Sequence, residues 1–70
     1  MKDVYTILNE TVEKIDHIIA LGRAPAVIRM NKTTQDKLGE YMVGRRLFDL
    51  PVMLAGEIAD DCATVYMEWA

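Results

Sequence analysis

The side chains best suited to catalysis or metal binding in this chain are few and stand apart from one another. His17 is the only histidine, and Cys62 is the only cysteine. A lone histidine near the end of a helical segment, on its polar side, is typical of a surface residue. A reactive thiolate needs a nearby cation or a helix N-terminus, whereas Cys62 follows two aspartates. Neither residue predicts a catalytic centre.

The densest acidic group is Asp60-Asp61 together with Glu57. Calcium loops need alternating oxygen ligands closed by a bidentate glutamate, and that spacing is absent here. We therefore interpret these carboxylates as a solvated turn. The chain also has no glycine-rich loop of the kind that cradles phosphates. We expect no catalytic residue, no metal ligand and no cofactor, and hence a protein that is not an enzyme.

Arginine, aromatic and methionine side chains are the remaining candidates, because these types dominate the energetics of protein interfaces. The expected partner-binding residues are Arg45, Arg46, Phe48, Tyr66 and Trp69. The same aromatic and methionine residues are also what a small core needs, so each has a structural alternative.

Arg45 and Arg46, with Lys32 and Lys37 before them, could form a basic edge near the second predicted helix. A planar guanidinium suits bidentate contact with phosphate. The alternative function is therefore a small nucleic-acid- or nucleotide-binding regulator. A solvated loop and an arginine contact to a partner protein remain open for the same residues.

The composition describes one small domain with more apolar material than its size can hide. Residues 1–70 are expected to form a single domain; 51 % of them are hydrophobic and five are methionine. A domain of this size buries only about 60 % of the surface that its unfolded chain exposes. The surplus predicts an apolar binding surface or a homo-oligomer. We expect the partner to be a protein or a second copy of the chain.

Charge and residue order disfavour several other classes. A net charge of -3 argues against broad nucleic-acid binding, which depends on neutralising phosphates. One cysteine excludes an intramolecular disulfide scaffold. Charged residues interrupt the first ten positions, unlike a signal peptide, and no stretch approaches the ~20 apolar residues of a membrane span. We expect a cytoplasmic protein without membrane contact.

Hydrophobic periodicity predicts a long amphipathic helix at the start of the chain. Residues 3–21 carry apolar side chains at helical spacing, with Asp3 as the N-cap and Gly22 as the stop. Residues 26–30 are rich in β-branched side chains and suit a strand.

The second half of the chain predicts a shorter helix and two strands. The helix is expected to begin near Thr33, whose hydroxyl can cap it, and to end before Gly44. Residues 47–55 are expected to be extended, with an edge, bulge or bend at Pro51, which lacks an amide donor. Residues 62–69 alternate as a strand does.

These elements predict an α+β fold in the order α-β-α-β-β. We expect a three-stranded, mostly antiparallel sheet with the long helix across one face and the short helix at an end. The last two strands are expected to form a hairpin through residues 56–61. The expected core joins apolar strand residues to the apolar stripe of the long helix: Val27, Val52, Leu54, Val65, Met67, Leu8, Val12, Ile15 and Ile19.

From Pro25 to Met67 the order of segments resembles part of the tailed-phage major capsid proteins and their encapsulin relatives. Extended Pro-Ala-Val-Ile-Arg-Met leads into Asn31 and a short helix, and Leu-Phe-Asp-Leu-Pro-Val leads through an acidic turn to Cys-Ala-Thr-Val-Tyr-Met. In that family the Leu-Pro-Val strand pairs with the strand after the acidic turn.

A capsid subunit is several times longer than this chain. The resemblance therefore implies a stand-alone phage or prophage protein that uses a capsid-like subdomain, either as a virion accessory or as a small host-directed inhibitor. It implies the host cytoplasm or the virion as the location. No active-site residues carry over from the family.

Overall fold

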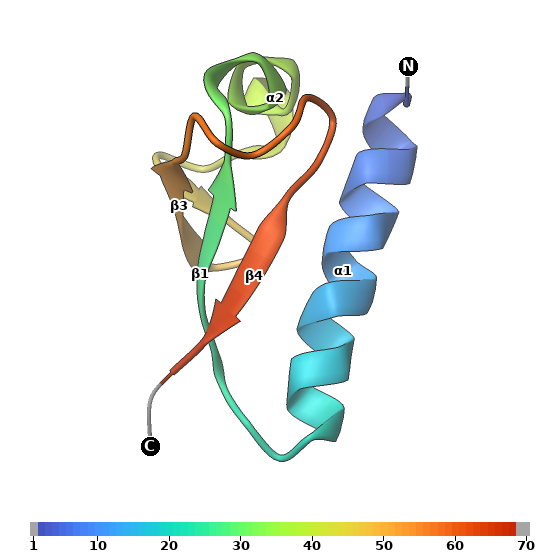
Figure 1. Cartoon of the computed structure of the whole chain (residues 1–70), viewed down its shortest axis with the longest axis vertical. Helices are drawn as coiled ribbons and strands as arrows, with labels where there is room; N and C mark the ends of the chain where they lie inside the picture. Colours follow the sequence, from blue (N-terminus) through green and yellow to red (C-terminus); the bar gives the residue numbers. More distant parts are fainter. Residues whose placement is uncertain (1, 69–70) are drawn as a thin grey trace.

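The computed structural model describes residues 2–68 and shows a long helix beside a four-stranded sheet (Figure 1). In chain order, its elements are α1 (Val4–Ala20), β1 (Pro25–Met30), α2 (Lys32–Lys37), the 3₁₀ turn η1 (Gly39–Tyr41), β2 (Arg46–Leu47), β3 (Leu50–Leu54) and β4 (Thr64–Met67). α1 lies beside β4, and α2 lies at one end of the sheet, as expected (Figure 1). Within residues 2–68, no helix is both long and apolar enough to cross a membrane.

Both predicted ends of α1 are confirmed. The Asp3 carboxylate accepts a hydrogen bond from the amide of Thr6 (2.7 Å), which satisfies one of the free donors of the first turn. After the last turn, Gly22 has φ +78, and its amide donates to the carbonyl of Ile19 (2.9 Å). Glycine is favoured at this left-handed position because it has no Cβ. These local signals set the length of α1.

The start and the end of α2 both differ from the prediction. Asn31, rather than Thr33, caps the helix, and its side-chain oxygen accepts from the amide of Thr34 (2.8 Å). The regular helix ends at Lys37, and a single 3₁₀ turn begins at Gly39. A glycine costs about 1 kcal/mol relative to alanine inside a helix, which favours this early end.

The sheet is mixed and has the strand order β2-β3-β1-β4. β1 pairs in parallel with β3, with Ile28 opposite Val52, and antiparallel with β4, with Ile28 opposite Val65. β2 and β3 form an antiparallel pair. The expected three-stranded sheet is therefore wrong in strand number. Two of the three strand pairs are antiparallel, but the β1–β3 pair is parallel, so the sheet is mixed. The α+β class is confirmed.

The expected hairpin through residues 56–61 is also wrong, because β3 and β4 lie on opposite sides of β1. The connection between them is tied across the end of β1 and the start of α2. Asn31 donates to the carbonyl of Ile58 (3.0 Å), and Thr34 accepts from the amide of Asp61 (2.9 Å). These hydrogen bonds hold the connection where it passes from the β3 side of β1 to the β4 side. The strand pairing that the capsid resemblance implies is therefore not formed, while the resemblance itself stays a prediction.

Asp61 belongs to this attachment, and its interpretation as part of a solvated turn is wrong. Its side chain is 13 % exposed and lies 2.6 Å from the Lys37 ammonium. The amide of Lys2 also donates to it (3.3 Å). The hydrogen bond from Lys37, followed by that from Lys2, lowers the pKa of the Asp61 carboxyl below its ordinary value. Glu57 and Asp60 are exposed, as the prediction of a solvated turn requires.

The lowered pKa of Asp61 predicts an acid-dependent loss of stability. Because the folded state prefers the charged carboxylate, its contribution is complete above the unfolded pKa of about 3.9 and is lost as the pH falls through the lower folded value. Asp61→Asn removes the charge and tolerates the φ of +59 at this position. Urea unfolding of both proteins from neutral pH to about pH 2 checks this. The stability difference between them should shrink in acid; a difference that stays constant would contradict the prediction.

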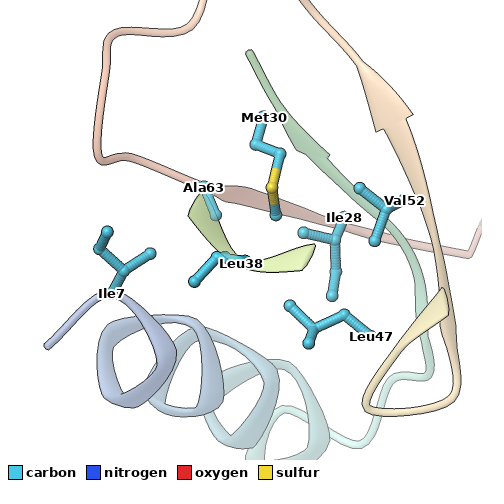
Figure 2. Close-up of a cluster of buried hydrophobic side chains, with 7 residues drawn as sticks. All are labelled: Ile7, Ile28, Met30, Leu38, Leu47, Val52 and Ala63. Carbon is cyan, nitrogen blue, oxygen red and sulfur yellow. The ribbon is translucent and has the colours of Figure 1, made fainter. Parts of the chain in front are cut away.

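The hydrophobic core lies between α1, the sheet and the segment after α2 (Figure 2). Its buried members are Ile7, Ile28, Met30, Leu38, Leu47, Val52 and Ala63. Of the expected core residues, Val52 is buried, and Leu8, Ile15 and Val65 pack against the cluster.

The remaining core expectations fail for identifiable reasons. β1 turns Ile28 and Met30 inward, so Val27 lies on the opposite face of the sheet. Leu54, Met67 and Ile19 lie at the ends of their elements and are largely exposed, whereas Val12 is half-buried.

Candidate interaction surface

Residues 43–50 turn back on themselves twice within eight positions. Val43 and Arg46 exchange two backbone hydrogen bonds (2.9 and 3.2 Å) around Gly44, which has φ +64. Phe48 and Asp49 then form a second two-residue turn, with φ +52 and +64, that joins β2 to β3. Positive φ at both central residues is typical of the type I′ hairpin turn. Two successive tight turns thus project from the edge of the sheet.

Phe48 is an unusual residue for its position in this turn. Type I′ turns favour asparagine, aspartate and glycine, because a bulky side chain in the left-handed region costs roughly 1–2 kcal/mol. The ring of Phe48 is 45 % exposed, so burial does not fully offset that cost. Arg46 Nη2 donates to the carbonyl of Asp49 (2.8 Å) and closes the turn. The bend that the sequence predicts at Pro51 lies here instead, and Pro51 is an ordinary member of β3 opposite Arg46.

The two turns gather exposed apolar side chains into one surface, here called the hairpin patch: Tyr5, Tyr41, Val43 and Phe48. Val43 is 83 % exposed, the largest fraction of any large apolar side chain in residues 2–68. Tyr5 of α1 meets Tyr41 edge to face, with ring centroids 6.2 Å apart. Tyr41, Val43 and Phe48 line a shallow hollow of about 280 Å³. Arg46 and Asp49 complete its wall and supply its polar rim.

The structure brings together only some of the predicted partner-binding residues. Arg46 and Phe48 meet at the hairpin patch. Arg45 lies in a different hollow, beside Lys32 of α2. Tyr66 lies on β4, at the opposite edge of the sheet from β2. Trp69 lies outside the described residues.

The basic edge expected from four cations is mostly dispersed. Lys37 pairs with Asp61 (2.6 Å), and Lys32 pairs with Asp36 (2.9 Å). Arg46 is engaged in the hairpin turn. Only Lys32 and Arg45 share a surface hollow. The nucleic-acid- or nucleotide-binding regulator stays a prediction, which a titration with nucleic acid at low salt would test.

Sequence reasoning did not identify Tyr5, Tyr41 and Val43 as surface partners of Phe48. Tyr41 lies at the end of the 3₁₀ turn η1, where it is exposed. The available signal was Val43-Gly44-Arg45-Arg46, in which glycine can occupy the first central position of a two-residue hairpin turn. The contact of Tyr5 with Tyr41 joins residues 36 positions apart, so no local pattern reveals it.

The lone histidine and the lone cysteine are not close to a common site. His17 lies in a groove between α1 and β4, beside Glu10, Glu13 and Lys14. Cys62 is half-buried in the connection that precedes β4. Among residues 2–68, no three His, Cys, Asp or Glu side chains gather as metal ligands would.

Comparison with known protein families, curated proteins and solved structures finds no match to this chain. Its functional interpretation therefore rests on its own surfaces, among them the hairpin patch, which carries the most exposed large apolar side chain of residues 2–68, Val43.

Proposed function

We propose that this chain is a non-enzymatic protein-binding domain that docks on a larger partner through the hairpin patch. The observation that carries the proposal is Phe48, a half-exposed aromatic ring held at a backbone position that disfavours it. Strained residues that persist at a surface are concentrated at functional sites. A residue that lowers stability without filling the core is expected to be useful in some other state of the protein, such as a complex.

The residue types of the hairpin patch support protein recognition. Tyrosine, phenylalanine and arginine are enriched at the centres of protein interfaces, where they contribute most of the binding energy. Here an arginine and two aromatic rings line one hollow with an exposed valine, and the third ring, Tyr5, packs against Tyr41. The two tight turns hold these side chains with little freedom, which reduces the entropy lost on binding.

In this proposal the partner is a phage protein or a host protein, as the resemblance to capsid proteins implies. The domain would act as a virion accessory or as a host-directed inhibitor. Both roles need a protein surface on the partner, and neither needs chemistry on this chain.

Replacing Phe48 with asparagine is expected to separate stability from binding. Asparagine tolerates a left-handed backbone, so Phe48→Asn should raise the free energy of unfolding by about 0.5–1 kcal/mol. The same change removes the largest apolar side chain at the tip of the hairpin and should weaken partner binding at least about tenfold. Urea unfolding measures the first effect. Photo-crosslinking from position 43, in the cell that encodes the protein, measures the second.

Leu54→Thr is the matched control, because Leu54 is at least as exposed as Phe48 (55 % against 45 %) but lies on β3 outside the hairpin patch. This variant should retain the crosslinked product that Phe48→Asn loses. A crosslinked product that persists in Phe48→Asn, or a loss of stability in that variant, would contradict the proposal.

A further inference from the structure

β4 is an edge strand of the sheet, with β1 on one side and, within residues 2–68, no strand on the other. Edge strands are normally shortened, charged, bulged or covered, because their free amide and carbonyl groups pair readily with other strands. The opposite edge strand, β2, is only two residues long. β4 has four residues, Thr64–Met67, without lysine or proline. It is the less protected of the two edges.

Hydrogen bonds near β4 show which of its backbone groups face β1. The amide of Glu68 donates to the carbonyl of Ala24 (2.9 Å), so the backbone of Glu68 faces β1. In an antiparallel ladder the bonded residues alternate, and Tyr66 and Thr64 therefore face β1 as well. The residues between them face the other way.

Val65 and Met67 thus present their amide and carbonyl groups to the open edge. Ala63 has the same orientation, and its carbonyl accepts a hydrogen bond from the Lys14 ammonium of α1. This contact supports the assignment, because Lys14 lies in the groove along the outer side of β4. It also means that one of the outward carbonyl groups already has a partner.

We propose that β4 pairs antiparallel with β4 of a second copy of this chain, about a two-fold axis at Tyr66. In this register Val65 of each copy stands opposite Met67 of the other, and their free backbone groups exchange hydrogen bonds. The two Tyr66 side chains stand directly opposite each other. A register centred on Val65 would instead require the carbonyl of Ala63, which Lys14 occupies. The inference concerns a different edge of the sheet from the hairpin patch and does not depend on it.

Arg29 is the reason to expect a second copy rather than an unrelated strand. Its guanidinium lies 5.5 Å from the ring centroid of Tyr66, on the face of the sheet away from α1. Among residues 2–68, its only ion pair is a long one, 4.0 Å to Glu57, and its Nε is buried without an acceptor. Within the described part of the chain, no carboxylate pairs with Arg29 on the Tyr66 side, where the edge is open.

The two-fold pairing supplies such a carboxylate from the same sequence. Within one copy, Thr64 of β4 is paired with Arg29 of β1. In the proposed dimer, Glu68 of the second copy lies opposite Thr64 on its other side. Residues 64, 66 and 68 share one face because side chains alternate along a strand. The carboxylate of Glu68 can then reach the guanidinium of Arg29 in the other copy. The symmetry forms this ion pair twice.

The same pairing covers apolar side chains that are exposed in the single chain. Tyr66 and Met67 are 43 % and 44 % exposed. A groove of about 520 Å³ runs between α1 and β4, lined in part by Ile18 and Val65. Met67 of the second copy, opposite Val65, would enter this groove. Aromatic pairs across antiparallel strands, as between the two Tyr66 rings, add further stabilisation.

A charge swap tests the proposed ion pair in the intact chain. Sedimentation velocity over a range of concentrations should show a dimer that dissociates on dilution. Arg29→Glu and Glu68→Arg should each raise the dimer dissociation constant at least about tenfold, because like charges then meet across the interface. The double variant Arg29→Glu/Glu68→Arg should recover most of the loss.

Two results of this experiment would overturn the proposal. A parent chain that stays monomeric at every concentration would exclude self-pairing and leave the edge to an extended segment of another protein. A dimer that Glu68→Arg leaves unchanged would place the contact elsewhere.

Cysteine trapping tests the register independently, in a Cys62→Ser background. Tyr66→Cys places two thiols directly opposite each other at a non-hydrogen-bonded position, where the Cβ atoms are close enough for a disulfide. Mild oxidation should convert this variant to a covalent dimer. Thr64→Cys is the matched control and should remain uncrosslinked, because Thr64 faces Glu68 rather than its own copy. Equal crosslinking of both variants would overturn the register.

Discussion

Ile28→Ala is expected to lower the free energy of unfolding by about 3 kcal/mol. Ile28 is fully buried in β1, which has strands on both sides, and it packs between Val52 and Val65. Alanine removes three carbon atoms and leaves a cavity. Because strands flank Ile28 on both sides, the surrounding structure cannot collapse to fill that cavity. In a domain whose total stability is of the order of 5 kcal/mol, this loss should leave a substantial unfolded population at 37 °C. Equilibrium urea unfolding followed by far-ultraviolet circular dichroism measures the change.

Val27→Ala is the matched control, one residue earlier on the same strand. Val27 is half-buried on the opposite face, across from Tyr66. Its truncation should cost about 1 kcal/mol or less. The two variants together test which face of β1 is turned toward α1. If Val27→Ala proved the more damaging of the two, the orientation of β1 described above would be incorrect.

Asn31→Ala is expected to cost about 2 to 3 kcal/mol, an unusually large effect for a residue that is not apolar. The side-chain oxygen caps α2 through the amide of Thr34. The side-chain nitrogen donates to the carbonyl of Ile58 (3.0 Å) and to the carboxylate of Asp60 (2.6 Å). One substitution therefore removes a helix cap and detaches the connection that leads to β4.

Thr33→Ala is the control for Asn31, because Thr33 is exposed and is the residue that the sequence pattern suggests as the cap. It should change the stability by less than about 0.5 kcal/mol. Thermal unfolding of both variants, with hydrogen exchange at the amides of residues 56–63, separates the two contributions of Asn31. Protection of the connection that persists in Asn31→Ala would show that other contacts hold it.

The parts of the fold that are predictable from the sequence are those with local causes. The length of α1 follows from its apolar spacing, the N-cap at Asp3 and the stop at Gly22. Each of these signals lies inside the helix or directly beside the end that it sets. The strand of residues 25–30 is equally local. Strand pairing is different, because residues 56–61 have the composition of a hairpin turn. Contacts with residues far earlier in the chain, among them Asn31, Thr34 and Lys37, hold this segment where it crosses β1 instead.

The faces of the strands were only partly predictable, for a related reason. Val27 and Ile28 are both β-branched, so β1 shows no alternation that would mark its buried side. A shift of one residue moves the whole set of side chains to the other face. β4 does alternate, and there the inward direction of Val65 is confirmed.

The candidate site was predictable by residue type but not by arrangement. Phe48 and Arg46 were named because aromatic and arginine side chains dominate interfaces, and they do share one surface. The turn that places them there has Phe48 and Asp49 at its centre. A single aspartate beside a phenylalanine, inside an apolar run, is a weak turn signal. Phe48 at the centre of this turn made the turn hard to predict from the sequence, and the proposed function rests on the same residue.

The central position of β1 has a consequence for the order in which the chain can fold during synthesis. β1 leaves the ribosome before β3 and β4, and both of its neighbours are encoded downstream. α1 emerges earlier still, although it contacts β4, the last strand of residues 2–68, more than any other element. Among the strands of residues 2–68, β2 and β3 are the only paired strands that follow one another directly in sequence. Their hairpin should be the first part of the sheet to form, and the nascent chain should gain its remaining structure in one late step when β4 emerges.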